Sequence, residues 1–456
     1  MSRFDVWRDS GQEVSIAGLA RSGTAAARLL AARGIRSYLS DGSDRAPLRA
    51  VAAELRTALG EMVTVEVGQH DLERIARSAA LVLSPGIPPD AAVVRAAQGA
   101  GVPVVAEAQV GLDALPAAEI IAVTGTNGKT TTTALIDHLL RVAGRRSVAA
   151  GNIGRPLSDI ALESPLPDWL AVELSSFQLH DMPDIAPVVG VLTNLAPDHL
   201  DRYPALADYY ADKARLFANA TNGSTWVQNA DDAASGEMMA HLPGRMLRFT
   251  VAGTGGADGW YDRSGDLLML GDQPLLPRPA LPLLGDHNVA NALAAAVAVH
   301  ATGVGVAAIA SGLASFQPLR HRMEVVRAVD GVLWINDSKA TNVASTRVAL
   351  EAMTRPFVLL LGGRHKGEPY TDLVGPLCRG GIAVVAYGEA AELIEQDLSP
   401  SIRVVRGTTF EDVVIKARLL APTGSAVLLS PACSSYDMFD NYEQRGATFR
   451  ALVEAM

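Results

Sequence analysis

The chain has 456 residues, of which 49% are hydrophobic and 19% are charged, and its formal net charge is −10. This length predicts roughly two to four domains, and the balance of hydrophobic and charged residues excludes a disordered chain. The negative charge argues against a nucleic-acid partner but allows a local basic pocket for a polyanionic small molecule.

The cysteines, the N-terminus and the apolar stretches indicate the compartment. Cys378 and Cys433 are far apart and lack metal-ligand spacing, which indicates a reducing compartment. The N-terminus, MSRFDVWRDSGQE, is charged and lacks the apolar core of a signal peptide. The most apolar stretch, NALAAAVAVHATGVGVAAIASGLASF, is interrupted by His300, Gly303 and Gly305 and predicts buried helices. We therefore expect a cytoplasmic protein without a membrane span.

The first part of the chain has the pattern of a βαβ unit. The segment EVSIAGLARSG precedes a helical pattern and a strand that ends in SYLSDGSD, which places Asp41 where a ribose-binding carboxylate would lie. Ala20 stands at the second glycine position of the dinucleotide-binding pattern, so an ordinary strand–helix turn is an equally good interpretation. The segment LVLSPGIPP repeats the theme and contains Gly86.

The segment IAVTGTNGKTTTTA predicts a phosphate-binding loop between a buried strand and a helix. It is shorter than the common NTPase pattern because Val123 stands where that pattern has its first glycine. Gly125 and Gly128 allow a phosphate to approach the backbone closely. Lys129 would supply positive charge, and Thr130 would offer a hydroxyl ligand to Mg²⁺. An ordinary glycine turn is the alternative, and the Lys-Thr pair argues against it.

Acidic residues follow further strand patterns of the central part. Glu173 ends the strand in AVELSSFQL, where a carboxylate near a phosphate loop suits Mg²⁺ and a helix cap is the alternative. The segment VLTNLAPDHLDRYP crowds Asp198, His199 and Asp201 into a turn, which suits either a metal or substrate site or a solvated turn. Lys213, in the amphipathic stretch YYADKARLF, has the pattern of a surface lysine. The Gly- and Asp-rich stretch TVAGTGGADGWYDRSGDLLMLGDQ predicts appended hairpins.

Polar residues also follow the strand patterns of the last third of the chain. The buried pattern GVLWI precedes a polar cluster, NDSKATN, that packing alone does not explain. Arg322 and Lys339 would bring positive charge to a transferring phosphoryl group. Asn291 suits the polar edge of an adenine, with helix capping as the commoner alternative. Lys366 suits a carboxylate or phosphate, and Cys433 is expected to be a small buried residue.

Eight short motifs occur in order along the chain: TGTNGKT, ELSSFQL, DHLDRYP, GDHNVAN, RHRME, NDSKATN, LLGGRHK and SPACSSYD. Each is weak alone, but the ordered set is specific, and the chain resembles the Mur ligase family of peptidoglycan synthesis. The resemblance implies an α/β fold of three domains. These are a Rossmann-like UDP-substrate-binding domain (1–108), a central P-loop ATPase-like parallel sheet with appended β-hairpins that binds ATP (109–318), and a Rossmann-like domain that binds amino acid and nucleotide (319–456).

The resemblance also implies roles for individual residues. The implied catalytic residues are Lys129, Glu173, His199, Lys213, Arg322 and Lys339. The implied ATP-binding residues are Gly125, Thr126, Asn127, Gly128, Lys129, Thr130, Thr131, Asn291, Arg322, Asp337 and Lys339. The implied substrate-binding residues are Ser22, Asp41, Gly86, Asn152, Ser175, Gln178, His199, Thr341, Lys366, Ser435 and Tyr442. The implied metal ligands are Thr130, Glu173, His199 and a carbamylated Lys213, which reverses the surface interpretation of this lysine.

The implied reaction is an ATP-dependent ligation that adds D-glutamate to UDP-N-acetylmuramoyl-L-alanine through an acyl phosphate. The implied cofactors are ATP and Mg²⁺ at two sites, with Mn²⁺ as an alternative metal, and we expect a monomer. An L-glutamate-adding variant and another Mur or folylpolyglutamate-type ligase remain open alternatives. From other classes, a dinucleotide-dependent oxidoreductase or an ATP-binding switch would leave the phosphate loop or the other polar loops unexplained. The sequence departs from the family pattern at Ala20, Gly42 and Tyr442.

Overall fold

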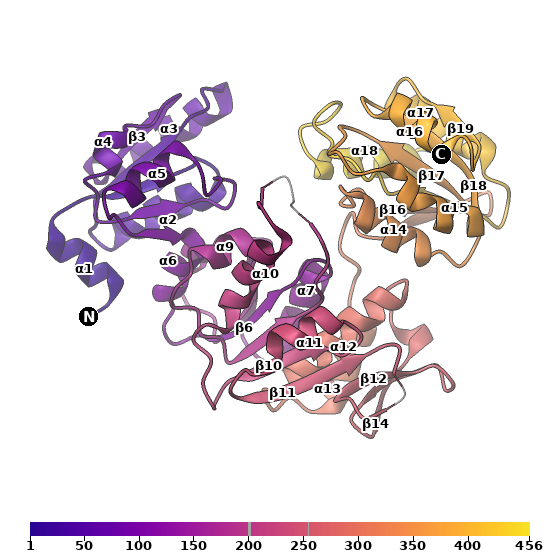
Figure 1. Cartoon of the computed structure of the whole chain (residues 1–456), viewed down its shortest axis with the longest axis horizontal. Helices are drawn as coiled ribbons and strands as arrows, with labels where there is room; N and C mark the ends of the chain where they lie inside the picture. Colours follow the sequence, from indigo (N-terminus) through magenta and orange to yellow (C-terminus); the bar gives the residue numbers. More distant parts are fainter. Residues whose placement is uncertain (199–201, 254) are drawn as a thin grey trace. The chain divides into compact units, whose positions relative to one another are not determined.

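Strands and helices alternate along the chain in the computed structural model, which describes residues 1–198, 202–253 and 255–456 (Figure 1). The described residues divide into two compact units. The first unit comprises Met1–Arg278 and Ala290–Ala314, and the second comprises Pro279–Val289 and Ser315–Met456. Two sheets lie in the first unit and one in the second. The predicted α/β class is confirmed, and the predicted boundaries of three domains stay a prediction.

The first sheet is parallel throughout and has the strand order β3-β2-β1-β4-β5. Its strands are β1 (Val14–Ala17), β2 (Ser37–Asp41), β3 (Val63–Val67), β4 (Leu81–Leu83) and β5 (Val104–Ala106). The helices of this part are α1 (Arg3–Ser10), α2 (Arg21–Ala32), α3 (Ala46–Leu59), η1 (Gly60–Met62), α4 (Leu72–Ile75), α5 (Ala92–Gly99) and α6 (Glu107–Asp113).

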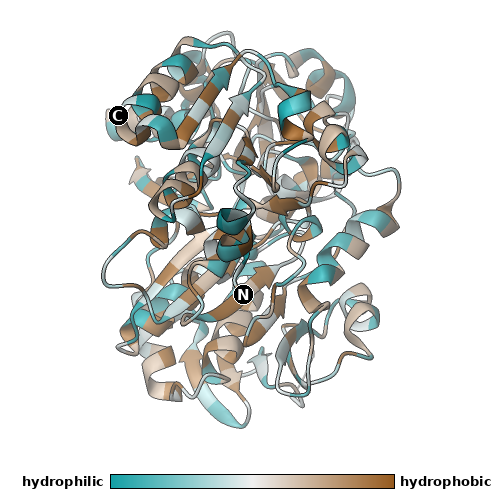
Figure 2. Cartoon of the chain, turned by 90° about the vertical axis from the view of Figure 1, so that its left-hand side faces the viewer, coloured by the Kyte–Doolittle hydropathy of each residue, from teal (hydrophilic) through white to brown (hydrophobic). Residues whose placement is uncertain are grey.

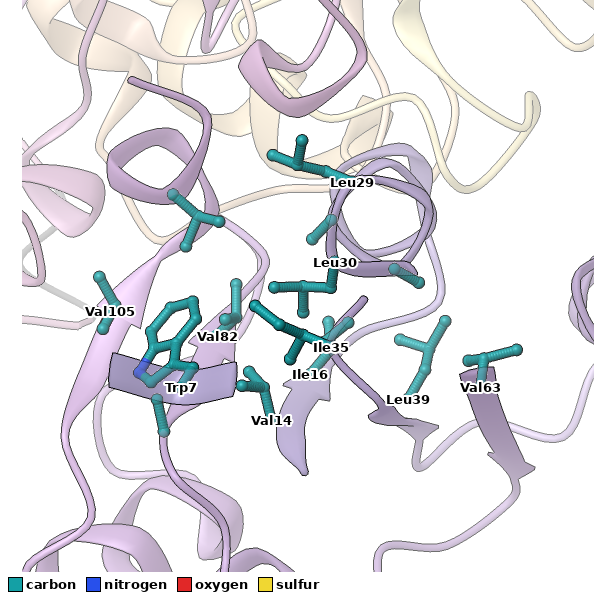
Figure 3. Close-up of a cluster of buried hydrophobic side chains, with 14 of the residues drawn as sticks. Trp7, Val14, Ile16, Leu29, Leu30, Ile35, Leu39, Val63, Val82 and Val105 are labelled. Atoms are coloured by element: carbon teal, nitrogen blue, oxygen red, sulfur yellow. The ribbon is translucent and has the colours of Figure 1, made fainter. Parts of the chain in front are cut away.

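Alternate residues of the first sheet enter two different cores, because side chains along a strand point to opposite faces. Val82 belongs to the core of Trp7, Ile16 and Leu30, whose side chains gather beneath α2 (Figure 3). Leu81 and Leu83 belong to the core on the opposite face, with Tyr38 and Val93. Both faces are thus covered, as parallel sheets require.

The second sheet has the order β14-β13-β12-β11-β10-β9-β6-β8-β7 and is parallel from β7 to β12. The antiparallel hairpins β12–β13 and β13–β14 confirm the predicted hairpin insert. The strands are β6 (Glu119–Thr124), β7 (Ser147–Gly151), β8 (Trp169–Glu173), β9 (Val189–Leu192), β10 (Thr225–Asn229), β11 (Arg245–Thr250), β12 (Gly259–Asp262), β13 (Leu267–Leu270) and β14 (Gln273–Pro277). The helices along this part are α7 (Lys129–Val142), α8 (Leu157–Ile160), α9 (Ser176–His180), α10 (Leu206–Ala214), η2 (Arg215–Phe217), α11 (Ala233–Met239), η3 (Arg278–Ala280), α12 (Asp286–His300) and α13 (Val306–Ser315).

The third sheet has the order β15-β16-β20-β17-β18-β19, and only its edge strand β15 is antiparallel among the described strands. Its strands are β15 (Glu324–Val329), β16 (Val332–Asn336), β17 (Phe357–Gly362), β18 (Gly381–Tyr387), β19 (Val404–Arg406) and β20 (Ala426–Leu429). The helices are α14 (Val343–Glu351), η4 (Tyr370–Leu373), α15 (Val374–Gly380), α16 (Ala391–Leu398), α17 (Phe410–Leu420) and α18 (Tyr442–Glu454). Every residue of β17, FVLLLG, is buried, which explains why this strand lacks polar alternation.

Hydropathy follows this layering: the strands are mainly hydrophobic, and the helices carry hydrophilic stretches (Figure 2). The most apolar stretch of the sequence forms α12 and α13, as expected. Among the described residues, no helix has both the length and the apolarity that crossing a membrane requires.

Candidate active site

The predicted phosphate loop connects β6 to α7 and depends on two glycines. Gly125 and Gly128 have φ angles of 142° and 83°, a region that L-residues with side chains rarely adopt. A Cβ atom at Gly128 would collide with Oδ1 of Asn291, and one at Gly125 would collide with Oγ1 of Thr193. These positions therefore require glycine for both conformation and space.

A loop that follows β9 supports the phosphate loop. β9 lies beside β6 in the sheet, so both strands deliver their following residues to the same edge. The backbone N–H of Asn127 donates to Oδ1 of Asn194 over 2.9 Å, and the N–H of Thr126 donates to the carbonyl oxygen of Asn194 over 2.8 Å. The hydroxyl of Thr193 donates to the carbonyl oxygen of Asn127 over 2.6 Å. In the sequence, only the end of the VGVL strand marks the position of this support.

Lys129 folds back over the phosphate loop. Its Nζ atom donates to the carbonyl oxygens of Gly125, 2.9 Å away, and Thr126, 2.7 Å away. Thr130 and Thr131 follow in the first turn of α7 and are buried. The loop thus combines an ammonium group, a helix N-terminus and a hydroxyl at one place, which fits a nucleotide phosphate and its Mg²⁺.

Glu173 ends β8, and its two carboxylate oxygens differ in their hydrogen bonding. Glu173 is 3% exposed, and its Oε1 accepts a hydrogen bond of 3.1 Å from Nδ2 of Asn152. Oε2 is buried and has no hydrogen-bond partner among the described residues. A buried carboxylate oxygen without a partner is costly unless a cation or water completes it. This orphaned oxygen beside the phosphate loop fits a metal ligand.

The helix-cap interpretation of Glu173 is wrong, because Ser175 caps α9. Ser175 and Gln178 form a capping box. The N–H and the hydroxyl of Ser175 donate to Oε1 of Gln178, and the N–H of Gln178 donates to the hydroxyl oxygen of Ser175. Asn152, which was predicted to guide a substrate, uses its amide to hold Glu173. The structure therefore gives these three predicted substrate residues local roles beside the metal candidate.

Lys213 is buried, so the surface interpretation from its local pattern is wrong. The residue is 1% exposed, its Nζ donates to the carbonyl oxygen of Gly125 over 2.7 Å, and it lies 4.5 Å from the ring centroid of Tyr209. Burial and the nearby Lys129 hold the pKa of Lys213 well below its usual range, against the opposing effect of Asp198, Glu173 and Asp212. The fold thus favours the neutral amine.

His199 and Asp201 lie outside the described residues, so the structure gives no position for this part of the predicted metal site. In the described part of the chain, no three His, Cys, Asp or Glu side chains gather as a ready metal site. Of the predicted metal ligands, the structure places Thr130, Glu173 and the amine of Lys213 at this edge.

The predicted UDP-binding residues lie where strands of the first sheet end and the next elements begin. The carboxylate of Asp41 accepts hydrogen bonds from the N–H groups of Leu19 and Ser43, each 2.9 Å long, so it holds the two loops together. Ser22 lies in the first turn of α2, and Gly86 lies in an exposed turn where a Cβ would meet nothing. The structure brings these loops to one edge, because β1 pairs with both β2 and β4.

In the second unit, the polar cluster after β16 lies beside two further loops. Nζ of Lys366 lies 3.4 Å from Oγ1 of Thr341, and Nζ of Lys339 lies 5.4 Å from the ring centroid of Tyr442. Ser435 is buried in the loop after β20. The structure therefore groups the predicted glutamate-binding residues in one region of this unit.

Asp337 is buried and firmly held. Its oxygens accept from the hydroxyl of Ser430 over 2.9 Å and from the N–H of Met323 over 3.2 Å. Burial raises its pKa to about 7, although these two hydrogen bonds and the charge of Arg322 oppose the shift. Asn291 lies against the phosphate loop, where its Oδ1 accepts from the hydroxyl of Thr132 over 3.3 Å. Their roles toward ribose and adenine stay predictions. Cys433 is buried as expected.

Three family models match successive parts of the chain. They are described as the MurD-like N-terminal domain of Mur ligases (residues 12–106), the Mur ligase middle domain (123–299) and the Mur ligase glutamate ligase domain (321–433).

Full-length relatives and solved structures agree with these models. A UDP-N-acetylmuramoylalanine–D-glutamate ligase of Salinibacter ruber is 43% identical over 97% of each chain. A protein of the same name from Myxococcus xanthus is 39% identical over 98% of this chain and 99% of its own. The fold resembles the UDP-N-acetylmuramate–alanine ligase of Thermotoga maritima, with a TM-score of 0.63 and 18% identity over 97% of this chain and 99% of that one. These matches confirm the predicted family and enzyme class: the chain belongs to the Mur ligase family of ATP-dependent ligases.

Proposed function

We propose that this ligase joins D-glutamate to UDP-N-acetylmuramoyl-L-alanine in the cytoplasm, as a monomer that consumes ATP. The near-full-length relatives that carry this activity in their names support the substrates. The observation that carries the chemistry is the open, buried Oε2 atom of Glu173 beside the loop that holds Lys129. An edge with these two groups suits a phosphate and its metal ion together.

The reaction couples two substitutions. A carboxylate is a poor electrophile, so an oxygen of the acceptor's L-alanyl carboxylate first takes the γ-phosphoryl group of ATP, and ADP leaves. The amine of glutamate then attacks the carbonyl carbon of this acyl phosphate. The C–O bond to phosphate breaks, the amine loses a proton, and an amide and inorganic phosphate result. Bringing two anions together requires positive charge at the transferring group.

The phosphate loop would supply part of this charge through Lys129 and the N-terminus of α7. Gly125, Thr126, Asn127, Gly128, Thr130 and Thr131 complete the proposed phosphate site. Arg322 and Lys339 would contact the transferring group, while Asn291 and Asp337 would hold the adenine and ribose. Mg²⁺ at two sites, or Mn²⁺, would neutralise charge on the phosphates when bound. Thr130, Glu173 and His199 would hold these ions.

Lys213 would take part as a carbamate. A neutral amine reacts with CO₂ to give a carbamate and a proton, and the fold favours the neutral amine of Lys213. The product is an anion with two oxygens, which would attract the ammonium group of Lys129, whereas a protonated Lys213 would repel it. Such a group would add oxygen donors beside Glu173, where the described His, Cys, Asp and Glu side chains form no group of three.

The UDP-linked acceptor and glutamate would bind at strand ends and loops of the three sheets. Ser22, Asp41 and Gly86 would contact the UDP part of the acceptor, and Asn152, Ser175, Gln178 and His199 would guide its muramoyl end. Glutamate would be held by Thr341, Lys366, Ser435 and Tyr442. Lys366 and Thr341, which already lie 3.4 Å apart, support this grouping.

A phosphate-release assay with the UDP-muramoyl-alanine acceptor and a panel of D- and L-amino acids tests the proposal. We expect release with D-glutamate and none without an amino acid. Release with L-glutamate alone would replace the D-specific function by the L-glutamate variant, and release with another amino acid would overturn the glutamate assignment. Acceptor labelled with ¹⁸O in its carboxylate should transfer label to the released phosphate. Phosphate without label would overturn the acyl phosphate.

A further inference from the structure

Arg445 is a buried arginine that has no role in the proposed mechanism. It lies in the first turns of α18, and its residue is 0% exposed. In the part of the chain that the structure describes, Arg445 forms no ion pair with a carboxylate. A buried charge without a counter-ion is costly unless hydrogen bonds compensate it. The partners of this side chain therefore indicate its purpose.

The guanidinium group of Arg445 donates to main-chain carbonyl oxygens from three different segments. Nη2 donates to the carbonyl oxygen of Ser338 over 2.9 Å, and Nε donates to the hydroxyl of the same residue over 3.0 Å. Nη1 and Nη2 both donate to the carbonyl oxygen of Cys433 over 3.2 Å. Nη1 also reaches the carbonyl oxygen of Gly362 at 3.5 Å. We call Arg445 with Ser338, Gly362 and Cys433 the carbonyl clamp.

The three clamped segments leave neighbouring parallel strands. Ser338 follows β16, Gly362 ends β17, and Cys433 follows β20, which lies between those two strands in the sheet. The carboxyl ends of these parallel strands lie at one edge of the sheet, where a single helix can reach all three segments. The hydroxyl of Ser338 also donates to the carbonyl oxygen of Tyr442 over 2.8 Å, which joins the start of α18 to the same cluster.

Each clamped segment carries a residue of the proposed glutamate site. Thr341 lies three positions after Ser338, Lys366 lies four after Gly362, and Ser435 lies two after Cys433. Tyr442 stands on α18 itself, three positions before Arg445. The clamp thus links every element that bears a proposed contact to the incoming amino acid.

Only arginine suits this task. Its planar group offers five N–H donors in a fixed fork, whereas a lysine ammonium is a single point that cannot reach three separated oxygens. The segments also contact one another directly: N–H of Ala432 donates to the carbonyl oxygen of Ala340 over 3.0 Å, and Arg364 and Ser434 exchange main-chain hydrogen bonds. Loss of the fork should therefore loosen the segments without unfolding the sheet.

We propose that Arg445 is a positioning residue for the acceptor amino acid: its fork sets the relative positions of Thr341, Lys366, Ser435 and Tyr442. This inference rests on the proposed function for the identity of the amino acid. The clamp itself does not depend on that identity.

The variants Arg445→Lys and Arg445→Met, compared with Phe449→Leu, test the inference. Phe449 lies one turn further along α18 in a core with Trp334, 5.9 Å between ring centroids, so its truncation weakens the packing of the same helix without touching the clamp. We expect both Arg445 variants to raise the KM for D-glutamate about 10- to 100-fold, because a small misplacement of positioning groups costs this much. The KM for the UDP acceptor should stay within about twofold of wild type. Phe449→Leu should lower stability and leave both KM values unchanged.

Hydrogen exchange of the intact proteins adds a readout that does not involve substrates. Amides after β16, β17 and β20 should exchange faster together in Arg445→Lys but not in Phe449→Leu. Unchanged exchange in Arg445→Lys would overturn the clamp. Faster exchange with an unchanged KM for D-glutamate, or equal rises in the KM of both substrates, would overturn the positioning role. If wild-type protein shows no amino-acid-dependent turnover while exchange responds as expected, the proposed function fails and the clamp stands.

Discussion

The Nζ atom of Lys213 donates a hydrogen bond to the carbonyl oxygen of Gly125 over 2.7 Å, although 88 positions separate the two residues in the sequence. This contact joins α10 to the phosphate loop. Nζ of Lys129 donates to the same carbonyl oxygen, so two amines share one acceptor inside a buried site. Two ammonium groups there would repel each other, so the charge that Lys213 carries affects the electrostatics of the loop.

Replacing Lys213 by alanine should lower ligase activity about 100-fold, because a preorganised charged group at the transferring phosphate is lost. Short carboxylic acids such as acetate should restore part of the activity by replacing the carbamate oxygens. Lys416→Ala is the matched control, since Lys416 lies on α17, where it forms an ion pair with Asp412 of the same helix. Wild-type protein in ¹³C-bicarbonate should show a carbamate signal that Lys213→Ala lacks. Full activity of Lys213→Ala, or no such signal, would contradict the carbamate.

Lys129→Ala should reduce ADP formation by about 10²- to 10³-fold with all substrates present, because the loop loses its ammonium group. Arg141→Ala, in the last turn of the same helix, should keep wild-type turnover. Circular dichroism of both variants should match wild type. Normal ADP formation by Lys129→Ala would mean that the loop does not act on the transferred phosphate.

The strands, the phosphate loop and the polar clusters at strand ends could be predicted because their signals are local. A β-branched run, a glycine turn and a helical repeat each occupy a few neighbouring residues. The burial of Lys213 has no such signal. Tyr209, Asp212 and Lys213 occupy one buried face of α10 at helical spacing, but two of them are charged, so a search for apolar stripes places that face in solvent.

The supports of the site were missed for a related reason. Asn194 binds a backbone 67 positions away, and Arg445 binds Ser338, 107 positions away. Each satisfies a main-chain group of a distant loop, and the pairing depends on the order of strands in the sheet. Asn152 likewise meets Glu173 only because β7 pairs with β8. Strand order cannot be read from a single local pattern.

Gly128→Ala should weaken ATP binding and destabilise the protein by about 1–3 kcal/mol, because the new Cβ would collide with Asn291 in a strained backbone conformation. Gly144→Ala is the matched control. Gly144 has a φ of 79°, close to the 83° of Gly128, but a Cβ there would meet nothing within 4 Å. The control should show the backbone strain alone, with unchanged nucleotide affinity in calorimetry. Equal nucleotide affinity in both variants would mean that the contact with Asn291 does not shape the loop.

Glu107, the first residue of α6, carries a buried carboxyl group that contacts α8, and it should make stability depend on pH. Its Oε1 accepts a hydrogen bond from the N–H of Ser158 over 2.9 Å. Burial raises the pKa of Glu107 from 4.5 to about 7. Hydrogen bonding by Ser158 opposes this shift, and the negative charge of Asp159 adds to it. A raised pKa in the folded state means that the folded protein holds a proton that the unfolded chain releases. The stabilisation is therefore complete below pH 4.5 and is lost as the pH rises through about 7.

Glu107→Gln removes this titration and keeps an oxygen to accept from Ser158. The free energy of unfolding of wild type relative to the variant should fall by on the order of 3 kcal/mol between about pH 4.5 and pH 8. Urea unfolding of both proteins across this range measures the difference, and Glu119→Gln, at an exposed position that starts β6, is the control. If the wild-type and Glu107→Gln curves stay parallel with pH, Glu107 is ionised in the fold at neutral pH. The junction between α6 and α8 would then have to hold a buried anion through the N–H of Ser158.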